Sequence, residues 1–360
     1  MDSSTNSSSS SYGSKATCRS IELYSKIVIG FIGTALNLAS MAVYANPRMS
    51  HLLNNKAKIN NILLFKSLSD LITLFRLVLV NLIRPDWSTN YAYFLFAHIY
   101  TYYISFISQL SSMLFDVAVS FDRYVIVANR FLFFTRINYR YLVAVIYIYS
   151  ALFYIFKFFQ FNYATQLTMN KTMPTTDKSP LIDAEFAYST ASRALGIIHS
   201  IQRDFLCVSL IIVLNVLLLV KIKRLLNKKR TLKSTTRSSV STLSIGKRQS
   251  STTTAATLSE NQREDSAELN LTIMVILTGL TAIIGHTTSI MAYLSNEELY
   301  KIDCFNLVNY TLYFLSYTVT FFFYVAFNKR FREIFLDYCL TVQSMIRRVK
   351  IALHDKLMRS

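Results

Sequence analysis

The sequence predicts an all-α membrane protein, a seven-transmembrane helix bundle with a short amphipathic eighth helix. The first observation is composition: 52% of the 360 residues are hydrophobic and 16% are charged, a balance typical of membrane proteins. The second is a set of long apolar segments, since about 20 residues are needed to cross roughly 30 Å of hydrocarbon. Seven such segments occur, at 22–45, 59–84, 96–124, 141–161, 196–224, 267–294 and 304–327.

Some of these segments contain polar residues, yet all are expected to be helical, because in lipid each segment must satisfy its own backbone hydrogen bonds. Residues 22–340 are therefore interpreted as one seven-helix domain that ends in the amphipathic stretch 328–340. The Ser-rich residues 1–21 are expected to form a disordered extracellular N-terminus, and residues 225–265 a disordered loop. Residues 341–360 are interpreted as a cytoplasmic tail.

Basic residues indicate how the chain crosses the membrane. The formal net charge is +18, but these residues gather between apolar segments on alternate sides, so no nucleic-acid partner is predicted. They are dense after the first and third segments, in 221–263 and after residue 328. Cytoplasmic loops carry such an excess, which predicts a multi-pass protein of the plasma membrane with its N-terminus outside. The glycosylation sequons at Asn6 and Asn170 both fall on the predicted outer side.

Four short motifs follow one another along the segments. The first segment contains Gly33 and Asn37, and the second contains Leu-Ser-Asp-Leu around Asp70. Asp122-Arg123-Tyr124 ends the third, and Tyr324 ends the seventh just before the amphipathic stretch. Their order and spacing resemble rhodopsin-like (class A) G-protein-coupled receptors over roughly residues 22–340. The sixth-segment run through His286 and the missing seventh-segment proline are loosely similar to invertebrate FMRFamide-type neuropeptide receptors.

The resemblance implies a receptor that binds an extracellular ligand and activates a heterotrimeric G protein inside the cell. Arg123 would be the switch residue, with Asp122 restraining it in the inactive state. Tyr124 and Tyr324 would line the intracellular cleft. Phe131, eight residues after Arg123, matches the apolar position that inserts into the G protein; anchoring of the loop in the membrane interface is the alternative.

The Ser/Thr-rich run 231–258 is a candidate target of kinases and, in such a receptor, of arrestin. A solvated linker is an equally good interpretation. Cys339, after the amphipathic stretch, is a candidate for palmitoylation and contact with membrane lipid, and an unmodified thiol is the alternative. Cys18 and Cys304 both lie on the predicted outer side, where they either form a disulfide, which we favour, or remain two thiols.

Asp70 is a carboxylate in the middle of a membrane segment, where an ionisable group is functional by default. Oxygen-bearing side chains are expected around it, in a pocket for water or a sodium ion. A plain hydrogen-bond network around a buried carboxylate is the alternative. The expected neighbours are Asn37, Ser112, Ser316 and Thr320.

Two further charges depart from the family pattern. Lys66 lies one turn from Asp70, and Asp116 lies seven residues before Arg123. Helical spacing puts Lys66 and Asp116 at the same depth on facing segments. We predict an ion pair between them, because either charge alone in that layer would cost several kcal/mol.

Candidate ligand-binding residues lie toward the outer ends of the segments. Arg76 could receive a ligand carboxylate or amide through its guanidinium fork, or it could snorkel or pair within the bundle. Ser105 and Gln109 stand where amine receptors carry an aspartate, so a biogenic amine is not the expected ligand. His286 is the fourth candidate.

A ligand-activated receptor is the function that these features favour, and the long outer stretch 162–195 favours a peptide ligand. A small-molecule chemosensory receptor differs only in its ligand. A membrane transporter is the alternative from another class, although it would require repeats or a charged path that the sequence does not display. No HExxH, GxSxG, P-loop or paired His/Cys motif occurs, so no catalytic residue, metal site or enzymatic activity is predicted.

Overall fold

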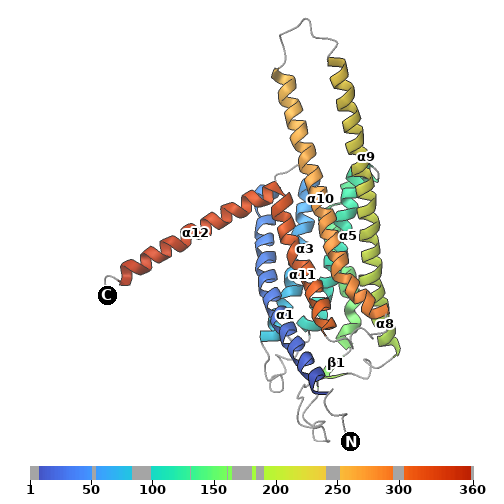
Figure 1. Ribbon diagram of the computed structural model, residues 1–360, viewed down its shortest axis with the longest axis vertical. Coiled ribbons are helices and arrows are strands. Elements are labelled where there is room, and N and C mark those ends of the chain that lie inside the picture. Colours follow the sequence, from blue (N-terminus) through green and yellow to red (C-terminus); the bar gives the residue numbers. More distant parts are fainter. Residues whose placement is uncertain are drawn as a thin grey trace, which may run out of the picture.

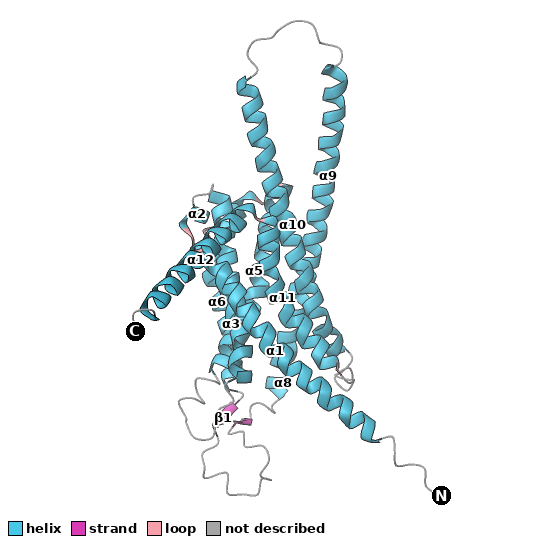
Figure 2. Cartoon of the chain, turned by 60° about the vertical axis from the view of Figure 1, so that its left-hand side comes forward, coloured by secondary structure: helices cyan, strands magenta, loops and turns pink. Residues whose placement is uncertain are grey.

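The structure is a computed structural model and describes residues 8–50, 54–82, 99–129, 131–159, 161–163, 181–183, 190–240, 252–294 and 304–357. Almost all of these residues are helical. Two short strands, β1 (Phe161–Tyr163) and β2 (Leu181–Asp183), pair antiparallel with Phe161 opposite Asp183. They lie at one end of a helix bundle, opposite the end that carries α2 (Figure 2).

The helices run along one long axis, except α12, which leaves the bundle at a steep angle (Figure 1). The long helices are α1 (Ser8–Tyr44), α3 (Asn54–Leu82), α5 (Ser105–Ala128), α6 (Tyr139–Tyr154), α9 (Val208–Val240), α10 (Thr252–Leu294), α11 (Phe305–Phe327) and α12 (Lys329–Leu357). The shorter ones are α2 (Pro47–Ser50), α8 (Thr190–Ser200), the 3-10 helices η2 (Leu132–Arg136) and η3 (Ile155–Phe159), and the π-helices η1 (Ile99–Ile104) and η5 (Ile201–Cys207).

Among the described residues, six helical stretches are long and apolar enough to cross a membrane, which indicates a multi-pass membrane protein. They are Ser20–Tyr44, Ile99–Ala128, Tyr139–Lys157, Ala194–Arg224, Leu269–Thr288 and Phe305–Phe327. Each overlaps one of the apolar segments predicted from the sequence. The remaining predicted segment corresponds to α3, a helix of 29 residues that carries Lys66, Asp70 and Arg76 along its length.

Helix α3 is held inside the bundle, where it packs mainly against α1 and α5. The contact with α1 is close at Gly33, where an added Cβ atom would lie 2.7 Å from Leu74 Cδ1 and 2.5 Å from Thr318 Oγ1. A side chain at this position would therefore push α1 away from α3 and α11. This packing turns Lys66 and Asp70 inward, and both are almost completely buried.

Helices extend into the described parts of the stretches that were expected to be disordered, and into the stretch interpreted as a cytoplasmic tail. Helix α1 already begins at Ser8, α9 continues to Val240, α10 begins at Thr252, and α12 continues through the predicted tail to Leu357. Both α9 and α10 extend well beyond the bundle (Figure 1). In the extension of α9, residues 225–240, Lys, Arg and Leu are frequent, and these are strong helix formers even where no core is available. Residues 1–7 and 241–251 lie outside the described residues.

Candidate functional site

A buried ionic cluster joins α3 to α5 in the middle of the bundle. The Lys66 ammonium nitrogen lies 3.0 Å from Asp70 Oδ2 and 3.1 Å from Asp116 Oδ2, and it donates to Ser112 Oγ at 3.1 Å. Ser112 in turn donates to Asp70 Oδ1. The predicted Lys66–Asp116 pair is thus present in the structure, and Asp70 is a second carboxylate on the same ammonium. The exposed fraction of none of the four residues exceeds 7%.

The cluster satisfies its own hydrogen bonds. An ammonium has three N–H donors, and three oxygens from two helices surround Lys66 Nζ. Carboxylate and hydroxyl oxygens are also the ligands that suit a hard cation such as sodium. In this structure the Lys66 ammonium stands at their centre, so a sodium ion at Asp70 would require Lys66 to move away.

The other residues expected around Asp70 have hydrogen-bond partners elsewhere. Asn37 donates to the backbone oxygens of Gly33 at 2.9 Å and Tyr317 at 3.2 Å, which ties α1 to α11. Ser316 and Thr320 each donate to a backbone oxygen of their own helix. The structure therefore brings only Ser112, of the four expected neighbours, into hydrogen-bond contact with Asp70.

A second buried ionic contact lies where α5 ends. Asp122 Oδ1 lies 3.1 Å from the Lys58 ammonium nitrogen of α3, and this nitrogen also donates to Phe134 O at 2.8 Å. Lys58 further lies over the Phe134 ring, with its nitrogen 4.4 Å from the centroid. Lys58 is thus a cation beside Asp122 that the sequence interpretation, which gave Asp122 to Arg123, did not name. Arg123 itself is buried, with an exposed fraction of 2%.

Aromatic side chains fill the same end of the bundle. Tyr324 is 1% exposed and packs edge-on against Tyr44 of α1, with ring centroids 5.3 Å apart, and against Phe331 of α12. Tyr124 is half-buried. Phe131 is 56% exposed and has a left-handed backbone with φ 53°. Its ring is thus available on the outside of the bundle, and this position suits either contact predicted for it.

A third buried polar cluster joins α10 to η5 near the opposite end. Arg203 donates to both oxygens of the adjacent Asp204 at 2.7 Å, and His286 Nδ1 lies 2.8 Å from Asp204 Oδ1. His286 is completely buried, and among the described residues its Nε2 has no hydrogen-bond partner. In the neutral imidazole the Nδ1 that faces a carboxylate carries the proton, and Nε2 is then a hydrogen-bond acceptor.

Gln109 of α5 extends this cluster to α11. Its Oε1 accepts hydrogen bonds from Arg203 Nη1 at 3.1 Å and from the Tyr313 hydroxyl at 3.0 Å. The Tyr317 hydroxyl donates to that of Tyr313 at 3.0 Å, and Gln109 Nε2 donates to Ser105 Oγ at 3.4 Å. We call these residues, with Asp204 and His286, the outer network: Ser105, Gln109, Arg203, Asp204, His286, Tyr313 and Tyr317.

Three of the four predicted ligand-binding residues, Ser105, Gln109 and His286, belong to the outer network. Arg76 is half-buried and lies over the Phe106 ring, with its guanidinium carbon 5.6 Å from the centroid. The sequence interpretation missed Arg203 and Asp204. The two residues could have been found from the sequence, because they form an adjacent pair of opposite charges inside an otherwise apolar segment, which is rare in the membrane.

The three clusters occupy successive levels of α5. Gln109, Asp116 and Arg123 are spaced by seven residues, and because an α-helix rises about 1.5 Å per residue, neighbouring levels are roughly 10 Å apart. Helix α5 therefore links the outer network, the Lys66 cluster and Arg123.

In comparisons with known proteins, no family model matches the chain, and no curated protein matches it.

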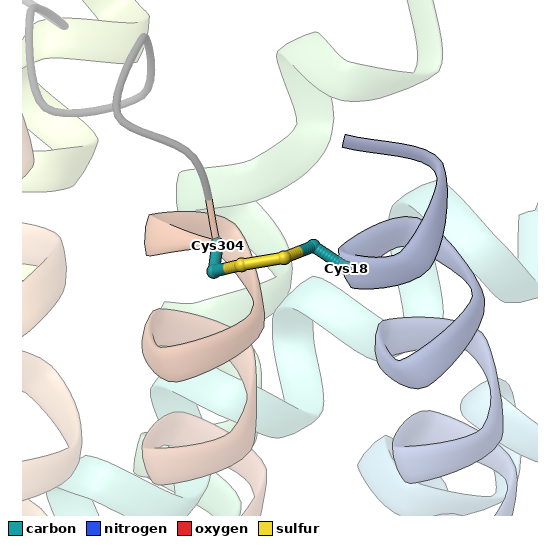
Figure 3. Close-up of a disulfide and its surroundings, with 2 residues drawn as sticks. All are labelled: Cys18 and Cys304. Carbon is teal, nitrogen blue, oxygen red and sulfur yellow. A yellow bond between two sulfur atoms is a disulfide. The ribbon is translucent and has the colours of Figure 1, made fainter. Parts of the chain in front are cut away.

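A disulfide ties α1 to the start of α11. Cys18 and Cys304, which the sequence placed on one side, are bonded with their Cα atoms 5.3 Å apart and 286 residues apart in the chain (Figure 3). Cys207 is a buried free thiol and Cys339 an exposed one, so Cys339 is accessible for the predicted palmitoylation. Asn6 and Asn170 lie outside the described residues.

Replacing Cys18 and Cys304 together by serine is expected to lower the stability of the folded protein by about 2–5 kcal/mol, because the crosslink closes a long stretch of chain. The measurement is thermal unfolding of the purified protein in detergent, with and without a reducing agent. Cys339→Ser is the matched control, since that thiol is free and exposed, and it should leave the curve unchanged. Equal unfolding temperatures for the double variant and the native chain would contradict a structural role for the disulfide.

Proposed function

We propose that the chain is a rhodopsin-like G-protein-coupled receptor of the plasma membrane, which transmits the binding of an extracellular ligand, favoured as a neuropeptide, to a heterotrimeric G protein. The observation that carries the proposal is the arrangement along α5. A buried polar network lies toward one end of this helix at Gln109, and a buried arginine, Arg123, lies near its other end. A change in the outer network can therefore be passed to Arg123 by one continuous helix.

In this proposal α3 also crosses the membrane, which brings the number of crossings to seven, and the first turns of α12 are the amphipathic eighth helix. The buried Lys66 and Asp70 support it, because charges that pair inside a bundle allow a less apolar helix to cross the membrane. Seven crossings place the two termini on opposite sides of the membrane, with the N-terminus outside, whereas six would place both on one side.

Epitope tags at the two ends of the chain distinguish these topologies. On intact cells we expect antibody to reach an N-terminal tag and not a C-terminal one, and permeabilisation should expose the second tag. Both tags accessible on intact cells, or both accessible only after permeabilisation, would contradict seven crossings.

Ligand recognition is assigned to the outer network. Its buried hydrogen-bonding groups come from α5, η5, α10 and α11, so one bound molecule could act on several helices at once. The acceptor at His286 Nε2 suits a hydrogen-bond donor such as a peptide N–H. A small-molecule chemosensory receptor would use the same residues with a different ligand.

A membrane transporter is the second candidate. The structure favours it more than the sequence did, because buried charged residues lie at three levels of the bundle. Buried ionisable groups at successive depths are typical of ion and proton paths. Proteoliposomes containing the protein would show ion or proton flux if this alternative were correct, whereas a receptor should leave an imposed gradient intact.

The receptor proposal is tested by measuring G-protein activation in cells that express the protein at their surface, challenged with a neuropeptide library. A response absent from untransfected cells is the expected result. Silence to peptides with a response to small molecules would favour the chemosensory alternative, and silence to both would contradict the proposal.

A further inference from the structure

Lys58 joins three elements at the end of the bundle where α5 ends. It lies in the second turn of α3, yet its side chain is only 6% exposed, and its ammonium nitrogen is 3.1 Å from Oδ1 of the buried Asp122. The same nitrogen donates to Phe134 O at 2.8 Å and lies 4.4 Å from the centroid of the Phe134 ring. The ammonium therefore contacts α5 through a charge, and η2 through a backbone carbonyl and a ring.

Phe134 faces the bundle from the middle of η2. Its ring packs edge-on against Phe121 of α5, with the centroids 4.8 Å apart. Its backbone nitrogen donates to Phe131 O at 2.9 Å, and its carbonyl accepts from Ile137 N at 3.2 Å. A carbonyl oxygen has two lone pairs, so it can accept from Ile137 and from Lys58 together. Lys58 is thus bonded to the backbone of η2 and not only to one of its side chains.

Two aromatic side chains are exposed at the same segment. Phe131 directly precedes η2 and is 56% exposed, and Phe133 is 65% exposed. Their ring centroids are 6.5 Å apart. The backbone of Phe131 is left-handed, with φ 53°, a conformation that costs a non-glycine residue about 1–2 kcal/mol. Such a conformation persists where surrounding contacts determine the backbone, and the hydrogen bond from Phe134 N to Phe131 O is one of those contacts.

The contacts of Lys58 act as a unit because its charge is buried. A buried ammonium that lost its carboxylate and its carbonyl would be left uncompensated, which is strongly unfavourable. Hydrogen bonds from charged groups are also stronger than those between neutral groups. A neutral side chain at position 58 would leave the Phe134 carbonyl with Ile137 N as its remaining donor among the described residues. The segment η2 would then be held less firmly to α3 and α5.

We propose that Lys58 is a positioning residue for coupling: it fixes η2 against α3 and α5, and so fixes where Phe131 and Phe133 are presented to the G protein. Lys58 is buried and acts through Phe134, without touching the partner itself. The coupling role rests on the proposed receptor function, whereas the anchoring of η2 does not. Ligand recognition should not change with Lys58, because the outer network lies toward the other end of α5.

The anchoring is tested on the full chain in lipid nanodiscs, with a nitroxide spin label on Phe133→Cys in a Cys339→Ser background, since the other free thiol is buried. Lys58→Met removes the charge and is expected to increase the mobility of the label. Lys58→Arg keeps a cationic donor and should largely restore the native spectrum. Arg136→Met is the matched control, because it removes an exposed charge of η2 itself, and it should leave the mobility unchanged.

Two further measurements separate anchoring from folding. A label on Val145→Cys, an exposed position of α6, should keep its mobility in the Lys58→Met variant. The double variant Lys58→Met/Asp122→Asn removes both buried charges, so it should fold even where the single variant does not. It still lacks the donor to Phe134, so its label at 133 should remain mobile. Native mobility at 133 in both variants, or an equal increase at 145, would overturn the proposal.

The coupling role is tested by ligand binding and G-protein activation at matched surface expression, with the ligand found in the peptide screen. Lys58→Met should bind ligand like the native chain but activate on the order of tenfold less, the size expected for one charged hydrogen bond. Lys58→Arg should recover most of the activation, and Arg136→Met should equal the native chain. Full activation by Lys58→Met would overturn the coupling role. Silence of the native chain would contradict the receptor function and this role with it, while the mobility at 133 still decides the anchoring.

Discussion

Replacing Lys66 by leucine is expected to be the most damaging single substitution in the bundle. The Lys66 ammonium lies 3.0 Å from Asp70 and 3.1 Å from Asp116, so its loss leaves two buried carboxylates without a cation. Breaking one buried pair costs about 3–5 kcal/mol, and surface expression should fall to a small fraction of that of the native chain. Asp116→Leu should be milder, because the Lys66–Asp70 pair remains.

The double variant Lys66→Leu/Asp116→Leu should be expressed better than Lys66→Leu alone, since it removes one of the two stranded charges. Lys329→Leu is the matched control. Its pair with Glu333 has the same spacing of four residues, but the Lys329 side chain is 79% exposed, so its loss should cost less than about 1 kcal/mol. Additive losses in a surface-expression assay, with the double variant worse than either single change, would contradict the ion cluster.

The second large effect is expected at Arg203. Its guanidinium donates to both oxygens of Asp204 and to Gln109, and Asp204 is 6% exposed. Among the described residues, Arg203→Leu therefore leaves the buried carboxylate with His286 as its remaining partner, which should cost about 3–5 kcal/mol. The measurement is thermal stability of the detergent-purified protein together with surface expression.

Two further variants separate the geometry of this contact from its charge. Arg203→Lys keeps the positive charge but lacks the planar fork that bonds both carboxylate oxygens, so partial recovery is expected. Arg224→Leu removes an exposed arginine later in the same stretch of helix and should be nearly neutral. Stability of Arg203→Leu equal to that of Arg224→Leu would show that the outer network does not hold the helices together.

The sequence predicted the helices through their apolar content and predicted some of the contacts through helical spacing. Lys66 and Asp116 could be paired because their distances from Asp70 and Arg123 place them at one depth. The bond between Lys66 and Asp70 was not predicted, although the two residues are four apart in the chain. Asp122 shows the limit of this reasoning, because a cation beside it, Lys58, comes from another helix. Only the rotation of α3 against α5 decides which cation reaches a carboxylate.

The outer network illustrates a second limit. His286 and Gln109 stood out as polar residues in apolar segments, but which groups they contact depends on the π-helix η5, which turns Arg203 and Asp204 inward. A π-helix shifts the face of every residue that follows it, and apolar content carries no sign of it. The helical extensions of α9 and α12 were missed for a third reason, since a polar composition alone cannot separate an exposed helix from a disordered chain.

The most direct test of the receptor account compares Arg123→Ala with Arg136→Ala in the G-protein activation assay, at matched surface expression and with the ligand found in the peptide screen. Arg123 is buried at the end of α5, whereas Arg136 lies exposed in η2 only 13 residues later. The account predicts that Arg123→Ala abolishes activation while ligand still binds, and that Arg136→Ala responds like the native chain. Full activation by the Arg123→Ala variant would contradict the role of Arg123 as the switch residue that passes the signal from α5 to the G protein.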